Sequence, residues 1–259
     1  MIQGIQLKFV VTLVLVLSLF QSFGQGKERI VQTEGLQINV KTQGKGKPTV
    51  IFENGMGSSM DAWEALPDSI ATFTAVFSYD RAGIGASHIS HASRTVPHMV
   101  EELRAVLKKE KIAPPYVYVA HSMGSYLARY FATAYPDEIQ ALLLVDPSPD
   151  KLYDDYTEKE YTDFQNFGDE SYAESSEGVK QEWEHYLKNR KYVQEKAVSD
   201  TIPMTIVSAT QWDFYSYHSG IMNKNENSKH LQVEGSHDIH QEKPDLIREL
   251  IQELISVSK

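Results

Sequence analysis

The chain has 259 residues, enough for one large α/β domain or two small ones, and its 41% hydrophobic and 23% charged residues are ordinary for a globular protein. A net charge of −10 argues against nucleic-acid binding, because the phosphate backbone attracts basic surfaces. The sequence contains no cysteine, which excludes disulfides, thiolate zinc sites, a cysteine nucleophile and lipid attachment to a cysteine.

The N-terminal segment, residues 1–24, has the order of a secretory signal. Lys8 precedes an apolar run at residues 9–20, and a small-x-small sequence follows at residues 22–24. This run is short for a spanning helix, which needs about 20 apolar residues. We therefore predict an exported protein, periplasmic or extracellular, that is cleaved near Gln25 and has no stable membrane insertion afterwards. The alternative is a membrane anchor formed by an uncleaved N-terminal segment.

Strand-like and helix-like runs alternate along the rest of the chain. Strands are expected at residues 28–35, 36–44, 49–53, 74–79, 116–120, 139–145, 203–209 and 230–234. Helices are expected at residues 62–70, 95–113, 125–135 and 182–196, and from Pro244 to the C-terminus. Alternation at these lengths implies right-handed crossovers and a mostly parallel sheet with both faces covered.

The segment at residues 147–202 breaks this alternation. It holds 14 acidic and 7 basic side chains, and therefore −7 of the total charge of −10, together with many aromatic residues. It is too long for a loop in a compact domain and shows no strand-like run. We predict a helical lid inserted between two strands of the sheet.

One short motif carries the strongest chemical signal. The strand that begins at Tyr116 ends in Ala-His-Ser-Met-Gly, at residues 120–124, and a helix-like segment follows at once. A strand, a sharp turn with a central serine and then a helix form the context of a nucleophile elbow. The small residues Ala120 and Gly124 lie two positions before and after Ser122, because a larger side chain at either position would meet neighbouring backbone.

Further motifs occur in a fixed order along the chain. They are the elbow, the loop Asn-Gly-Met-Gly-Ser-Ser at 54–59, the loop Asp-Arg-Ala-Gly-Ile-Gly-Ala-Ser at 80–87 and the sequence Gly-Ser-His-Asp-Ile-His-Gln-Glu-Lys-Pro at 235–244. With these motifs the chain resembles the α/β-hydrolase superfamily over about residues 28–259. The resemblance implies a mostly parallel eight-stranded sheet flanked by helices, with a helical cap inserted after the sixth strand. The core would then comprise residues 28–146 and 203–259, and the cap residues 147–202.

The resemblance implies a nucleophile and a base. Ser122 matches the nucleophile of the family, and a serine hydroxyl needs an adjacent base to take its proton. His237 matches the histidine of the family, because it follows the last strand and precedes a helix. His240 is expected to be structural, and His121 is expected to point away into packing. The other histidines are expected at the surface or in loops, namely His88, His91, His98, His185, His218 and His230.

Two residues are candidates for the carboxylate that orients the base. The family usually places this acid after the strand expected at 203–209, where Asp213 is the only nearby acid. Some members of the family use an acid after the sixth strand, where this chain has Asp146. Asp213 comes one residue later than the common pattern of the family and no glycine turn precedes it, and the sequence leaves both candidates open.

The resemblance also indicates an oxyanion hole, formed by the backbone N–H groups of Met56 and Met123. Asp80 and Arg81 are expected to brace the adjacent loop. No pair of histidines shows metal-site spacing, so we predict neither a metal nor a cofactor.

The expected function is hydrolysis of a carboxylic ester, thioester, lactone or amide of a small or medium molecule. Ser122 excludes the relatives that use aspartate at this position, the haloalkane dehalogenases and epoxide hydrolases. One alternative is an aminopeptidase similar to proline iminopeptidases, whose cap could bind an α-amine. The other is a binding protein of this fold without turnover. The expected partner is a small-molecule substrate, and no nucleic acid is expected.

Overall fold

The computed structural model describes residues 26–33 and 35–257. The predicted signal segment and its cleavage site near Gln25 lie outside these residues. Among the described residues, no helix has both the length and the hydrophobicity that crossing a bilayer requires.

The core is one eight-stranded sheet in the order β1-β2-β4-β3-β5-β6-β7-β8. Its strands are β1 (Arg29–Thr33), β2 (Leu36–Gln43), β3 (Thr49–Glu53), β4 (Ala75–Tyr79), β5 (Tyr116–His121), β6 (Ile139–Val145), β7 (Met204–Ala209) and β8 (Lys229–Val233). The pairs β1–β2 and β2–β4 are antiparallel, and all the other pairs are parallel. The mostly parallel eight-stranded sheet expected from the sequence is confirmed.

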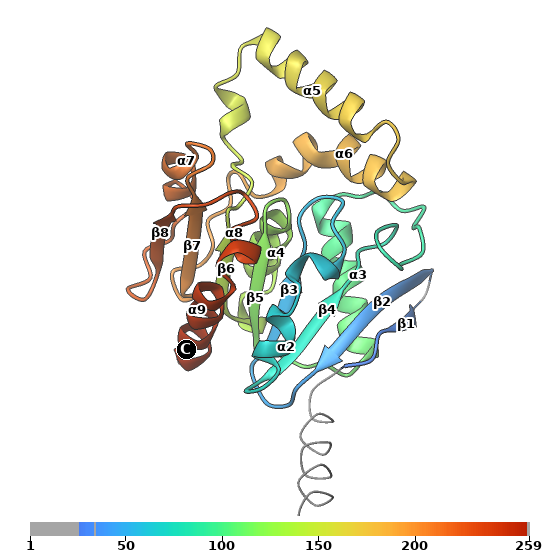
Figure 1. Ribbon diagram of the computed structural model, residues 1–259, viewed down its shortest axis with the longest axis vertical. Coiled ribbons are helices and arrows are strands. Elements are labelled where there is room, and N and C mark those ends of the chain that lie inside the picture. Colours follow the sequence, from blue (N-terminus) through green and yellow to red (C-terminus); the bar gives the residue numbers. More distant parts are fainter. Residues whose placement is uncertain (1–25, 34, 258–259) are drawn as a thin grey trace, which may run out of the picture.

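Helices cover both faces of the sheet (Figure 1). The longer helices of the core are α3 (Val96–Lys109), α4 (Gly124–Ala134) and α9 (Pro244–Ser256), and the shorter ones are α2 (Leu66–Ile70), α7 (Tyr215–Ser219) and α8 (Ile239–Glu242). The single helix expected at 62–70 is instead a 3₁₀ turn at Met60–Trp63 followed by α2, with Pro67 near the start of α2. Proline is favoured there because the first turn of a helix needs no N–H from it.

Alternate side chains of the central strands enter two separate cores. Tyr118 and Ala120 of β5 pack with α3 and α4, whereas Val117 and Val119 pack with α2 and α9. Successive side chains of a strand point to opposite faces, so a strand buried on both sides is apolar throughout. This is why β5 reads as an apolar run from Tyr116 to Ala120. Because β5 lies between β3 and β6 in the sheet, its carboxyl end lies in the middle of the molecule.

The segment between β6 and β7 contains two helices, α5 (Glu158–Tyr172) and α6 (Glu177–Asn189), with short 3₁₀ turns at Leu152–Asp154 and Arg190–Tyr192. Figure 1 shows α6 next to the core and α5 beyond it. We call residues 147–202 the cap. The helical insertion expected after the sixth strand is confirmed, although α6 begins and ends earlier than the helix expected at 182–196. The helix α5 was not expected as a separate element.

Candidate active site

Ser122 occupies a sharp turn between β5 and α4. Its φ angle is +52°, and its N–H donates to Val145 O of the neighbouring strand at 3.1 Å. A Cβ atom on Gly124 would lie 2.7 Å from Asn54 O, so only glycine fits there. The strained turn is therefore fixed by a strand on one side and by a loop on the other, and Ser122 lines the cavity above it.

His237 lies in the turn after β8 and is held by Asp146. Its Nδ1–H donates to Asp146 Oδ2 at 2.6 Å. The other oxygen, Oδ1, accepts the N–H of Ala209 at 2.9 Å, so the carboxylate is fixed at both ends. Asp146 is 2% exposed and has a φ angle of +39°, which turns it out of β6 towards the histidine. This bond keeps the proton on Nδ1 and leaves Nε2 free to accept one.

Asp213 does not reach this site. It is exposed, and no hydrogen bond or ion pair involves it in the described part of the chain. Backbone bonds from Thr210 to Val233, the last residue of β8, and from Gln211 to Gly235 carry the strand pairing onward, so Asp213 emerges beyond the site. The ring of the preceding Trp212 lies 4.9 Å from that of His237 instead. Of the two candidate acids, the structure therefore brings Asp146 to the histidine.

Ser122 and His237 line one cavity, but no hydrogen bond joins the Ser122 hydroxyl to the His237 ring among the described residues. Such bonds are often long before a substrate binds. Met56 lies at the same cavity, and Met123 is the residue before α4. The two backbone N–H groups expected to form an oxyanion hole therefore belong to segments that adjoin Ser122.

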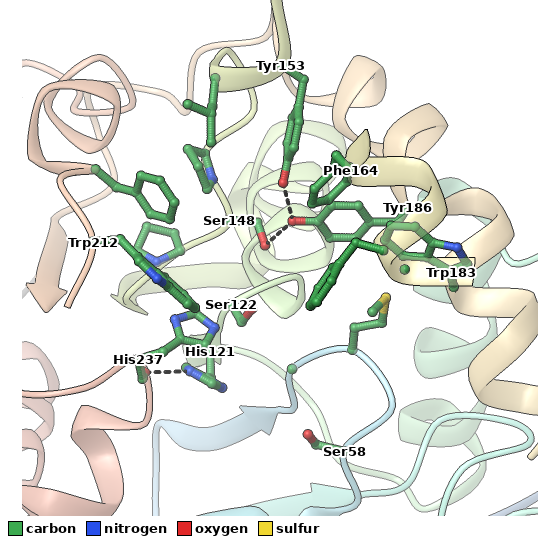
Figure 2. Close-up of a pocket in the computed structure, with 18 of the residues that line it drawn as sticks. Ser58, His121, Ser122, Ser148, Tyr153, Phe164, Trp183, Tyr186, Trp212 and His237 are labelled. Carbon is green, nitrogen blue, oxygen red and sulfur yellow. Dashed lines mark hydrogen bonds between the residues drawn. The ribbon is translucent and has the colours of Figure 1, made fainter. Parts of the chain in front are cut away.

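The cavity has a volume of about 400 Å³ and lies between the elbow and the cap (Figure 2). Aromatic side chains dominate its wall, namely Tyr153, Tyr156, Phe164, Phe167, Tyr172, Trp183, Tyr186, Trp212 and Phe214. No lysine or arginine is among the described residues that line it. The site is therefore mostly apolar, has a few polar groups and is of a size that suits a small molecule.

Three hydroxyl groups form a chain inside this aromatic wall. Tyr186 donates to Ser148 Oγ at 3.0 Å, and the Tyr153 and Tyr186 hydroxyls are 2.9 Å apart (Figure 2). A phenol has one proton, so Tyr153 must donate to Tyr186. Burial raises the pKa of Tyr153 well above its usual value, which keeps it a donor. The sequence analysis missed this group, because the cap tyrosines were considered only as apolar rings.

His121 packs between two other histidines, with its ring tilted against each of theirs. Its ring centroid lies 4.5 Å from that of His237 and 4.4 Å from that of His240. Burial, followed by repulsion from both neighbours, holds the pKa of His121 well below its usual value. Its Nε2–H donates to the His237 carbonyl at 2.9 Å. His121 is 5% exposed and packs as expected, but it does not point wholly away from the site, because it also lines the cavity and supports the loop of His237.

His218 also departs from the expected arrangement. It was expected at the surface, yet it is completely buried. Its Nε2–H donates to Pro147 O at 2.7 Å, and Nδ1 lies 2.6 Å from Ser208 Oγ. This imidazole thus holds the first residue of the cap against β7.

The group most suited to a metal ion among the described residues is His121, Asp238 and His240, whose ligand atoms lie within 4.8 Å of one another. One nitrogen of each histidine is already engaged, since His121 Nε2 bonds to His237 O and His240 Nε2 to Ala62 O. An ion bound through either of these atoms would have to displace a backbone hydrogen bond. Since both of these nitrogens already have backbone partners, the cluster fits packing better than coordination.

Comparison with known proteins agrees with this architecture. The family model of the alpha/beta hydrolase fold matches residues 48–204. The protein YqjL of Bacillus subtilis is 28% identical over 224 residues, which cover 79% of this chain and 82% of YqjL. The pimeloyl-[acyl-carrier protein] methyl ester esterase of Hamiltonella defensa is 33% identical over 107 residues, covering 41% of this chain and 39% of the esterase.

Solved structures share the fold at low sequence identity. The Cif epoxide hydrolase of Acinetobacter nosocomialis superposes with a TM-score of 0.74 at 14% identity, covering 88% of both chains. A thermophilic esterase of Thermogutta terrifontis superposes with a TM-score of 0.65 at 15% identity, covering 88% of this chain and 97% of the esterase. The match to the family model extends from β3 to the start of β7 and includes the elbow. The chain therefore belongs to the alpha/beta hydrolase fold family.

Proposed function

We propose that this protein is a serine hydrolase that cleaves a carboxylic ester, or a related thioester, lactone or amide, through an acyl-enzyme on Ser122. The observation that carries the proposal is the 2.6 Å hydrogen bond from His237 to the buried Asp146, whose two oxygens each accept a hydrogen bond, at the same cavity as the elbow serine. A histidine held in one tautomer at the same cavity as an elbow serine is the arrangement that acyl transfer requires.

In the first step, Ser122 Oγ attacks the carbonyl carbon of the substrate, and His237 Nε2 takes the hydroxyl proton. The carbonyl π-electrons move to the oxygen, and the N–H groups of Met56 and Met123 stabilise the resulting oxyanion. Two such donors are worth roughly 3 kcal/mol each in comparable enzymes. Asp146 stabilises the imidazolium that forms on His237.

In the second step, the bond to the leaving group breaks, and the imidazolium gives its proton to the departing oxygen or nitrogen. The acyl group stays on Ser122 Oγ. Water then attacks the acyl carbon while His237 takes one of its protons, and the carboxylic acid leaves as Ser122 regains its proton.

The cavity supports an uncharged substrate with an apolar acyl or alcohol group. Its volume of about 400 Å³ and its aromatic wall match a small or medium molecule. Without a lysine or arginine at the wall, a carboxylate or phosphate group would be buried there without a counter-charge, which is costly. The hydroxyl chain of Tyr153, Tyr186 and Ser148 gives such a substrate one polar contact.

An aminopeptidase activity receives less support. Binding of an α-amine needs a free carboxylate in the cap, but the fully buried Glu182 is paired with Arg81 at 2.6 Å. The Asp169 carboxylate accepts from Trp183 Nε1 at 2.7 Å.

We also propose that the protein is exported, on the strength of the sequence of residues 1–24 alone, and N-terminal sequencing of the mature chain tests this.

A fluorophosphonate probe tests the hydrolase proposal directly. We expect the wild-type protein to be labelled at Ser122 and to hydrolyse short p-nitrophenyl esters, and we expect Ser122→Ala to abolish both. A protein of this fold that only binds ligands would give neither labelling nor hydrolysis. That result across an ester, lactone and aminoacyl-amide panel would refute the proposal.

The two aspartates form a matched pair for the same assay. We expect Asp146→Asn to lower kcat by about 10⁴, because an amide can stabilise the wrong tautomer of His237 and cannot stabilise the imidazolium. Asp213→Asn should leave kcat within about twofold, since Asp213 is exposed and contacts no residue of the site. Circular dichroism checks that both variants fold. The opposite ranking would assign the acid to Asp213.

A further inference from the structure

The cap helix α6 places a buried carboxylate against the loop that carries Met56. Glu182 is fully buried, and its Oε2 accepts the N–H of Gly57 at 2.8 Å. Both oxygens of Glu182 also accept from Arg81, with Nε at 2.6 Å and Nη2 at 2.9 Å. Arg81 and Glu182 are 101 positions apart in the sequence, so only the docking of α6 onto the core creates this contact.

The same guanidinium group holds the backbone on the other side of the loop. Arg81 Nη1 donates to Asn54 O and Nη2 to Gly55 O, both at 2.7 Å. Nη1 also donates to Glu53 Oε1 at 2.7 Å. Arg81 is 2% exposed, so these bonds are shielded from water and worth more than surface contacts.

These contacts determine where the Met56 N–H points. The Gly55 carbonyl and the Met56 N–H belong to one peptide unit, and in a trans peptide they point in opposite directions. Arg81 draws the carbonyl to its own side, so the N–H faces away from Arg81. No backbone or side-chain acceptor is bonded to this N–H within the described residues. Within the described residues, the Met56 N–H is therefore a fixed and unpaired donor, and it lies beside the cavity that Met56 lines.

Glu182 is needed to keep this arrangement. Arg81 is paired with two carboxylates, Glu53 of the core and Glu182 of the cap. Without Glu182, the Nε–H of Arg81 and the N–H of Gly57 would both lose their buried acceptor. Unpaired buried donors are costly, and the guanidinium and the loop would shift to reduce that cost.

We propose that Glu182 is a positioning residue for the oxyanion hole, and that helix α6 of the cap is therefore a structural part of the hole. The proposal rests on the function proposed above for Ser122. It predicts that the Met56 N–H reaches its working position only while α6 is docked through Glu182 and Arg81. A residue that only anchored α6 would affect stability and substrate binding. It would not affect how well the enzyme stabilises the developing oxyanion, and this separates the two roles.

Asn189 provides the control for anchoring. It lies at the other end of α6, is fully buried, accepts the N–H of Val96 at 2.9 Å and donates to Arg94 O at 2.9 Å. Among the described residues, no hydrogen bond joins it to the loop at 54–58. Asn189→Ala therefore weakens the docking of α6 without touching the loop that carries Met56.

The test compares Glu182→Ala, Glu182→Gln and Asn189→Ala in the full-length protein. Four quantities would be measured for each variant. They are the thermal unfolding temperature, kcat and KM with p-nitrophenyl acetate, inhibition by a trifluoromethyl ketone, and the rate of Ser122 labelling by a fluorophosphonate. The ketone forms an oxyanion on the enzyme and so reports on the hole. We expect Glu182→Ala to lower kcat by roughly 100-fold with KM nearly unchanged, and to weaken ketone binding and slow labelling by a similar factor.

The variants separate the outcomes. Glu182→Gln keeps an acceptor for Gly57 but loses the charge, so we expect an intermediate loss, and this variant decides the question if Glu182→Ala does not fold. Asn189→Ala should lower the unfolding temperature yet keep kcat within about twofold. Unchanged kcat, labelling and ketone binding in a folded Glu182 variant, or an equal loss in Asn189→Ala, would overturn the proposal. Labelling and ester hydrolysis by the wild type test the proposed function separately.

Discussion

The two helices of the cap are attached to the molecule in different ways. Helix α6 has four buried residues, Gly178, Glu182, Tyr186 and Asn189, whereas α5 has only Gly168 among those described. Gly178 lies directly against the backbone of Gly83 in the core, since a Cβ on Gly83 would come within 2.8 Å of Gly178 Cα. Helix α6 thus contacts core backbone directly, through glycine at one end and through Glu182 and Asn189 further along.

Helix α5 is held mainly by aromatic side chains of the cap. The ring of Phe164 lies 5.4 Å from that of Trp183 on α6, and Gly168 lies beneath the same indole. The start of α5 is stabilised locally by a capping box of Thr157 and Glu160. The cap therefore has an inner helix that packs directly against the core and an outer helix that mainly forms the cavity wall.

Two glycine substitutions test most directly whether α6 and α5 differ in their attachment to the core. A Cβ on Gly178 would lie 2.1 Å from Gly83 O, a backbone atom that cannot rotate away. We expect Gly178→Ala to lower the free energy of unfolding by about 3 kcal/mol, the upper end for overpacking, and to lower kcat as well. Urea denaturation and ester kinetics measure both effects.

Gly168→Ala is the matched control on the outer helix. The added methyl would meet the Trp183 side chain, which can shift, and alanine itself favours the helix by about 0.5–1 kcal/mol. The expected change in unfolding free energy is below about 1 kcal/mol, with an altered KM for bulky esters. Equal destabilisation by the two substitutions would contradict the division into inner and outer helices.

Acidification tests a further attachment of the cap, the bond between His218 and Pro147, and its expected effect is smaller. Burial outweighs the nearby Asp146 carboxylate and lowers the pKa of His218 to about 4, against about 6.5 in the unfolded chain. The unfolded state therefore binds more protons between these values, and stability falls as the pH falls through this range. For this one group the loss between pH 7 and pH 5 is about 2 kcal/mol.

We expect His218→Gln to remove this part of the pH dependence, although it also weakens the bond to Pro147 at pH 7. Urea denaturation at pH 7 and pH 5 gives the slope. His88→Gln, at an exposed position, is the control and should keep the wild-type slope. A His218 variant that lost as much stability on acidification as the wild type would show that the buried imidazole is not the cause.

The parts of the molecule that the sequence predicts are those set by local pattern. Apolar runs mark each central strand, because β3 and β5 are buried on both faces and tolerate no polar face. The elbow was visible because a strand, a small-residue turn and a helix are adjacent in the chain. The capping box of Thr157 and Glu160 is also a local pattern, although α5 was not predicted from it.

What the sequence did not reveal depends on contacts between distant segments. Asp146 and Asp213 both follow strands, and their difference arises from the backbone turn at Asp146 and the N–H of Ala209 that fixes its carboxylate. The brace formed by Arg81 was expected, but its partner Glu182 lies in another segment with many acids. His218 is buried because α7 folds back onto β7. No local sequence pattern predicts this packing.

The outer helix has a practical consequence for protein engineering. The segment between Thr157 and Ser176, which cap the starts of α5 and α6 with their side chains, contributes Phe164, Phe167 and Tyr172 to the cavity wall. A combinatorial library confined to this segment is expected to change which molecules the cavity accepts while the contacts of α6 with the core stay in place.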